Sequence, residues 1–248
     1  MLLLRGSGRS LLVFAIVLSS AALHAADPAC AQQDFQRAQS LVQQAEAAHA
    51  AGDLPASLEF YTQALDILRT VRGAEQWQAY CSVERGRVLG DLGRYAEATA
   101  ALEEALALYG TIEGMAFEKA RCHEGLGYSL TEMNNTAEAA SHYEEALRLY
   151  QALSHTDSDQ ARCHERLAVL FGDVGRQEEA VTQAEQAMAI YESTAGRERD
   201  QARCVGFAAS MLQQIGKHSE ALGDYHRGLA LLQSVQAGAL EEGPYYWG

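Results

Sequence analysis

Apolar residues recur along most of the chain at spacings of three and four, which is the period of a helix with one buried face. In one stretch, Ala139, Tyr143 and Ala146 follow this spacing, and the polar residues Ser141 and Glu144 lie between them. Stretches of this kind come in pairs that are separated by short turns. The pattern therefore predicts amphipathic helices that are joined into antiparallel hairpins.

The paired stretches repeat at a constant interval of 41 residues. The turn column is Gly52, Gly93, Asn134, Gly175 and Gly216, and the cysteine column is Cys81, Cys122, Cys163 and Cys204. Five copies stand in register between residues 35 and 235, without an insertion. Because one helical hairpin cannot bury both of its faces, we expect the copies to stack on one another and share a continuous core.

The repeat resembles the tetratricopeptide repeat family at the positions of that family's signature. The signature is a Leu-Gly or Leu-Ala pair with a large residue three positions later, then a Gly in the turn, and then Ala-x3-aromatic-x2-Ala. The matching residues of the third copy are Leu126, Gly127, Leu130, Asn134, Ala139, Tyr143 and Ala146. The resemblance implies an all-α fold, a right-handed superhelical solenoid of five helix-turn-helix repeats over residues 35–235.

The interval is longer than the 34 residues of the common repeat. The seven extra residues amount to about two helical turns, so they lengthen the second helix without rotating its buried face. In this respect the chain is similar to the long-helix branch of the family, which is found in kinesin light chains and in many bacterial repeat proteins.

The segments outside the repeats have their own patterns. In residues 1–26, Arg5 and Arg9 precede an apolar run, and small residues follow it, which is typical of a secretory signal peptide. The apolar run is too short to cross a hydrocarbon layer of about 30 Å. We expect cleavage and a secreted or periplasmic protein with no membrane span, and an uncleaved N-terminal anchor is the alternative. Residues 27–34 are predicted as a short linker and 236–248 as an aromatic tail.

Charge and motifs exclude several functions. The chain has Lys+Arg 19 against Asp+Glu 33 and a net charge of −14, which falls to −16 without the two arginines of residues 1–26. Such a surface repels a phosphate backbone, so we expect no nucleic-acid partner. The sequence has no nucleophile elbow, phosphate loop or paired metal-binding histidines. We therefore expect neither catalysis nor a cofactor.

The cysteine column allows two interpretations. Equivalent residues of stacked repeats lie about 9–10 Å apart, beyond the ~7 Å Cα separation that a disulfide allows. The column is therefore interpreted as small, buried apolar filler between helices. The alternative is a metal or redox carrier that uses Cys81, Cys122, Cys163 and Cys204, for example with Cu(I). The fifth cysteine, Cys30, could pair with Cys81 or with another chain.

The residues that precede three of these cysteines form an arginine column. Its members are Arg121, Arg162 and Arg203. The family resemblance implies that first helices line the concave surface and that a basic residue in this column contacts a partner's terminal carboxylate. It also places Arg87, Tyr128 and Arg166 toward the groove. The alternative is a solvated helix face, in which Arg121 pairs with Glu124 and Arg162 with Glu165.

The last repeat has no following helix to cover its apolar residues Ala221, Leu222, Tyr225 and Leu229. Either the tail segment 244–247 or the same face of a second chain, in a homodimer, would cover them. The alternative is a frayed tail without a structural role. Taken together, the sequence predicts an exported scaffold that binds a protein or peptide segment, acidic or C-terminal, on its concave face. A periplasmic metal or redox protein and a structural assembly subunit are the alternatives.

Overall fold

The computed structural model describes residues 28–194 and 196–241, all of which lie in helices or in the short connections between them. The predicted signal peptide and the tail segment 244–247 lie outside the described residues. The ten helices are α1 (Pro28–Ala50), α2 (Leu54–Leu68), α3 (Glu75–Asp91), α4 (Tyr95–Gly110), α5 (Ala116–Glu132), α6 (Thr136–Gln151), α7 (Asp157–Asp173), α8 (Gln177–Glu192), α9 (Glu198–Gln214) and α10 (His218–Glu241). They form five successive hairpins, repeats one to five, which confirms the predicted all-α solenoid of helix-turn-helix units.

Helices extend into both segments that flank the predicted repeats. Helix α1 begins at Pro28 and includes residues 28–34 of the predicted linker. Proline is well tolerated at the first position of a helix, and the residues that follow it include alanine and glutamine but no glycine. Helix α10 continues to Glu241 and takes in the first part of the predicted tail, where alanine, leucine and glutamate favour a helix.

The turn column is explained by its backbone conformation. The four glycines of the column have φ between 73° and 80°, the left-handed region that residues with a side chain seldom adopt. Asn134 takes the glycine position in repeat three with φ 59°. A second left-handed column, also 41 residues apart, lies between the second helix of one repeat and the first helix of the next. It consists of Gly73, Gly114, His155 and Gly196.

Small residues let the two helices of a repeat approach closely. A Cβ atom on Gly127 would lie 2.8 Å from Cε1 of Tyr143, so the glycine of the Leu-Gly pair leaves the space that this buried ring occupies. The alanines of the second helices, such as Ala105 and Ala146, are fully buried. Large side chains in neighbouring columns fill the remaining space, as ridges fill grooves in other helix pairs.

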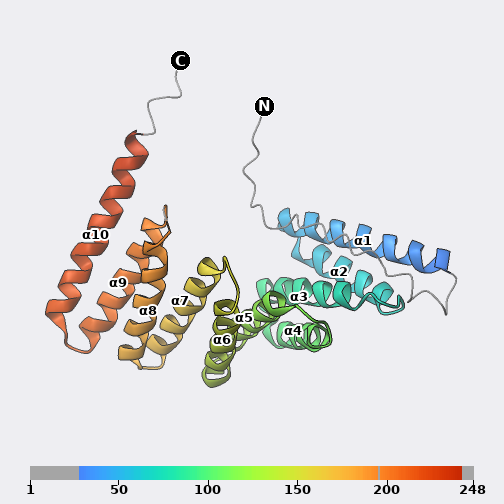
Figure 1. Cartoon of the computed structure of the whole chain (residues 1–248), viewed down its shortest axis with the longest axis horizontal. Helices are drawn as coiled ribbons and strands as arrows, with labels where there is room; N and C mark the ends of the chain where they lie inside the picture. Colours follow the sequence, from blue (N-terminus) through green and yellow to red (C-terminus); the bar gives the residue numbers. More distant parts are fainter. Residues whose placement is uncertain (1–27, 195, 242–248) are drawn as a thin grey trace, which may run out of the picture.

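The hairpins stack in one row. Each second helix packs on the first helix of the next repeat, and the first helices also meet one another, α3 against α5 and α5 against α7. Figure 1 shows the row bending, with α3 and α5 on the inner side of the bend and α4 and α6 on the outer side. The first helices therefore line the inner face. Within the described part of the chain, no helix is long and apolar enough to cross a membrane.

Candidate functional site

The predicted groove residues all lie on first helices. Arg87 is on α3, Arg121 and Tyr128 are on α5, Arg162 and Arg166 are on α7, and Arg203 is on α9. All six residues therefore belong to the helices that line the inner face. They differ in what they contact, and the contacts divide them into two groups.

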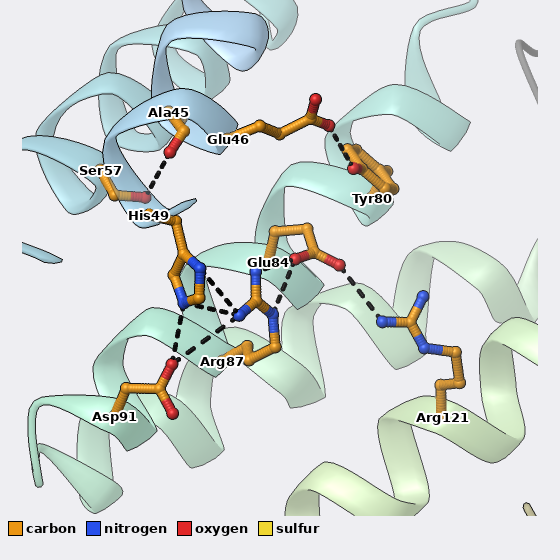
Figure 2. Close-up of polar contacts among 9 residues, drawn as sticks. All are labelled: Ala45, Glu46, His49, Ser57, Tyr80, Glu84, Arg87, Asp91 and Arg121. Carbon is orange, nitrogen blue, oxygen red and sulfur yellow. Dashed lines mark hydrogen bonds and ion pairs between the residues drawn. The ribbon is translucent and has the colours of Figure 1, made fainter. Parts of the chain in front are cut away.

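In the N-terminal half of the inner face, two arginines share one buried carboxylate (Figure 2). Glu84 accepts hydrogen bonds from Arg87 at 2.9 Å and 2.7 Å. The other carboxylate oxygen of Glu84 accepts from Nη2 of Arg121 at 3.2 Å. Glu84 is only 6% exposed, so the two guanidinium groups compensate a charge that has been removed from water.

Further polar contacts join repeat one to repeat two on the same face (Figure 2). The hydroxyl of Tyr80 donates to Glu46 of α1 at 2.7 Å. The ring of His49 lies 3.0 Å from Asp91 and 2.6 Å from Nη1 of Arg87. Arg87 thus contacts both its own helix and α1, which fixes the direction of its side chain.

In the C-terminal half of the inner face, arginines also bond to a glutamate of the preceding repeat, but that glutamate stands one position earlier in the repeat than Glu84 does. Nη2 of Arg162 donates to Glu124 of the preceding repeat and to Asp159, both at 2.8 Å. Nη2 of Arg203 donates to Glu165 of the preceding repeat at 2.5 Å and lies 2.9 Å from Asp200. The same glutamates accept a hydrogen bond from a buried tyrosine, Tyr150 to Glu124 and Tyr191 to Glu165.

These contacts form a cross-repeat ladder on the inner face. Its rungs are Tyr80–Glu46, Arg121–Glu84, Arg162–Glu124 and Arg203–Glu165. Hydrogen bonding to Glu124 raises the pKa of Arg162 above its ordinary value. The column is therefore a row of charge-neutralised pairs, and the partners of Arg162 are Glu124 and Asp159 rather than the Glu165 expected from local spacing.

Arg166 differs from the ladder arginines. It is exposed, and its guanidinium lies 5.6 Å from the centre of the Tyr128 ring, a cation–π contact. Tyr128 packs edge-on against Tyr95, with ring centres 6.1 Å apart. Val169 is one turn beyond Arg166 on α7 and is 45% exposed. Across the described residues, Arg166 has no carboxylate within ion-pair distance, so its charge faces solvent.

The four column cysteines are separate, buried thiols. Cys81, Cys122, Cys163 and Cys204 belong to four different core clusters and none is in a disulfide. Burial raises the pKa of Cys81 and of Cys122 to about 12, so both thiols stay protonated at neutral pH. Cys30 is exposed and free, so the suggested pairing with Cys81 is not formed. No three metal-ligating side chains converge within the described ranges.

One polar pair was not identified from the sequence. His123 of α5 and His142 of α6 approach with their Nδ1 atoms 2.9 Å apart, which requires one ring to donate and the other to accept. One repeat later, His164 makes the same contact to Oε1 of Gln183 at 2.7 Å. The 41-residue interval relates both pairs, so a search for polar residues in matching columns of the two helices would find them.

Comparisons with known proteins agree with this architecture. A model described as the tetratricopeptide repeat matches residues 20–110 and 118–193, more than half of the chain. A search of curated proteins finds no significant match.

Three solved structures illustrate the similarity. The TPR-like repeats of a putative kinesin light chain from Podosopora anserina are 20% identical, with a TM-score of 0.69, over 82% of this chain and 98% of that chain. BtubC (BKLC) from P. vanneervenii is 18% identical with a TM-score of 0.66, over 89% and 92%. The apo form of RapI is 14% identical with a TM-score of 0.72, over 81% and 72%. At such identities the similarity concerns the fold.

Proposed function

Because the chain belongs to the tetratricopeptide repeat family, whose members generally mediate protein–protein interaction, we propose that it binds an extended protein segment along its inner face. The observation that carries this proposal is the patch formed by Arg166, Tyr128 and Val169, in which a cation, an aromatic ring and an aliphatic side chain lie together without a carboxylate partner. We call these three residues the inner-face patch. In an acidic chain, an uncompensated arginine on a concave surface suits an anionic ligand.

The chemistry of the patch defines the ligand. The planar guanidinium of Arg166 offers two parallel N–H donors to a carboxylate, either an acidic side chain or a free C-terminus. Val169 and the ring of Tyr128 offer apolar contact to a neighbouring side chain of the same segment. Binding on a pre-formed surface needs no covalent step, so we propose a scaffold role without catalysis.

The ladder arginines have a different role in this proposal. Arg121, Arg162 and Arg203 already have carboxylate partners, so a ligand carboxylate would have to displace them. We therefore assign these residues to holding the repeats in a fixed relative position. The primary contact to the partner is assigned to Arg166.

We also propose that the protein acts outside the cytoplasm. The support is the basic, apolar and small-residue order of residues 1–26. Fractionation of the producing cell, with N-terminal sequencing of the purified protein, tests this. A soluble extracytoplasmic protein that starts near residue 27 is expected, and full-length protein in the cytoplasm would contradict the proposal.

A peptide-binding experiment tests the inner-face patch. Peptides selected from a random library with free C-termini are measured by fluorescence anisotropy, each as the acid and as the C-terminal amide. Arg166→Glu is expected to weaken binding about tenfold or more, because it replaces an attraction with a repulsion. Arg148→Glu is the matched control, since Arg148 is an exposed arginine of the second helix α6. Equal affinities of the two variants would refute the assignment of Arg166.

A further inference from the structure

Helix α10 exposes an apolar stripe that the other repeats bury. Leu222, Tyr225, Leu229 and Leu232 are 58%, 39%, 55% and 45% exposed. The residues one repeat earlier in two of these columns, Ala184 and Tyr191, are buried beneath the next first helix. Tyr225 donates its hydroxyl to Gln213 of α9 at 3.2 Å, so the polar end of the ring is satisfied while its face stays open.

We infer that this stripe binds the same stripe of a second copy of the chain, in an antiparallel α10–α10 contact with two-fold symmetry. An isologous contact requires that residue i meets residue j while j meets i. The stripe fulfils this because its spacing is three, four and three. In an antiparallel pair, Leu222 lies opposite Leu232 of the partner subunit, and Tyr225 lies opposite Leu229 of the partner subunit.

The opposite end of the solenoid excludes head-to-tail stacking. In the later repeats, the first helix packs on the preceding second helix through apolar residues such as Cys122 and Leu126. At the equivalent positions of the repeat, α1 has the polar residues Ser40 and Gln44. Both are exposed, and Nε2 of Gln44 donates to the backbone carbonyl of Ser40 at 3.2 Å. A polar end of this kind caps a repeat array. It gives the apolar stripe of α10 no matching surface on α1 of another copy.

Charge also favours self-association at this face. The chain carries 33 acidic residues, yet the helical positions beside the stripe are His218, His226 and Gln233. The acidic residues Glu220 and Asp224 lie on other sides of α10. Two copies can therefore meet here without bringing carboxylates together, although the molecule as a whole is strongly negative.

Residues 242–248 alone are too short to cover the whole stripe. Residues 242–248 span at most about 24 Å when fully extended. Leu222 precedes Glu241, the end of α10, by about 28 Å along the helix axis. A second copy covers the whole stripe, because the partner's α10 has the same length.

Analytical ultracentrifugation over a dilution series tests the inference. The mass of the purified chain is expected to change from about twice that of the monomer toward that of the monomer on dilution. Leu229→Glu with Leu232→Glu should keep the helical content and shift the midpoint of dissociation at least tenfold toward higher concentration. Ala230→Glu with Ser234→Glu adds the same charge to other exposed positions of α10 and should leave dimerisation unchanged. A monomer at every concentration, or equal effects of the two double variants, would overturn the inference.

Cross-linking distinguishes the symmetric dimer from cover by the tail. In a Cys30→Ser background, His226→Cys lies next to the proposed two-fold axis, so mild oxidation should give a covalent dimer. Ala230→Cys is the control and should cross-link much less. Deleting residues 242–248 should leave the dimer intact. If the deletion converts a monomer into a dimer, the tail covers the stripe and the inference fails.

Discussion

Repeats three and four have the same helical arrangement, but they differ at two buried positions that face each other between the two helices of the repeat. In repeat three, Gly127 of α5 faces the ring of Tyr143 on α6. In repeat four, the same columns hold Ala168 and Ala184, both buried. The comparison shows that the residues in these two columns depend on each other, because together they must fill the same space between the two helices. A missing side chain on one helix makes room for a ring on the other, and two methyl groups are an alternative solution.

We expect the largest loss of stability when one residue of the Gly–Tyr pair in repeat three is replaced by the residue that repeat four has at the same position. Gly127→Ala places a methyl group 2.8 Å from Cε1 of Tyr143, which is closer than packed atoms allow. Such overpacking should lower the free energy of unfolding by about 1–3 kcal/mol in urea titrations. The reverse exchange, Ala168→Gly, lacks a clash and should cost only about 1 kcal/mol through helix propensity.

A double-mutant cycle tests the cause. In a Tyr143→Ala background, which copies the alanine pair of repeat four, Gly127→Ala should lose most of its penalty. An unchanged penalty would show that the ring does not cause the effect.

The next largest effect concerns the cross-repeat ladder. Glu124 accepts hydrogen bonds from Arg162 of the next repeat and from Tyr150 of its own. Glu124→Gln should therefore lower the free energy of unfolding by about 1–2 kcal/mol. Glu165→Gln should cost less, because its partner Arg203 is more exposed.

Glu145 provides the matched control. It pairs with exposed Arg148 within a single helix, so Glu145→Gln should change stability by less than about 0.5 kcal/mol. Similar losses for Glu124→Gln and Glu145→Gln would contradict a special role for contacts that cross repeats.

The smallest effect concerns the histidine pair and depends on pH. Burial, and for His123 also the nearby His142, lowers the pKa of both rings below 6.5, although Glu145, Glu138 and Glu103 act in the opposite direction. The unfolded chain then binds protons that the folded chain does not, so stability should fall as the pH drops below about 6.5. Urea unfolding between pH 7 and pH 5 measures this loss.

Exchange between the repeats sharpens the test. His142→Gln copies the His164–Gln183 pair, in which an amide oxygen can accept from the ring in either charge state. This variant should lose less stability on acidification than the parent, by a few tenths of a kcal/mol. Gln183→His should lose more. Equal slopes for the three proteins would rule out coupling between the two rings.

The sequence predicts the repeated framework well because a constant interval fixes which residues share a face. It predicts that Arg121, Arg162 and Arg203 lie together on first helices, as the structure shows. It does not predict their partners, because local spacing favours pairs within a helix while the stacking brings Glu124 beside Arg162, 38 residues away. The position equivalent to Glu124 in repeat two is Val83, so Arg121 donates to the adjacent residue, Glu84, instead.

The unpaired charge of Arg166 was equally hidden in the sequence. Its column holds Glu84 in repeat two and Gly125 in repeat three, so no periodic pattern marks it. Only the stacked structure shows that the guanidinium of Arg166 lies over the ring of Tyr128 of the preceding repeat, without an ion pair to a described carboxylate.

The cross-repeat ladder affects how the solenoid unfolds when it is pulled. At the two C-terminal rungs, Arg162–Glu124 and Arg203–Glu165, peeling away the later hairpin leaves a largely buried glutamate without its cation. Force on the C-terminus would first break the contacts that hold repeat five, the ion pairs Arg227–Glu192 and Arg203–Glu165 among them. The pair Arg162–Glu124, which holds repeat four, would follow. The solenoid should therefore unfold under force in discrete steps, one hairpin after another, and should not extend continuously.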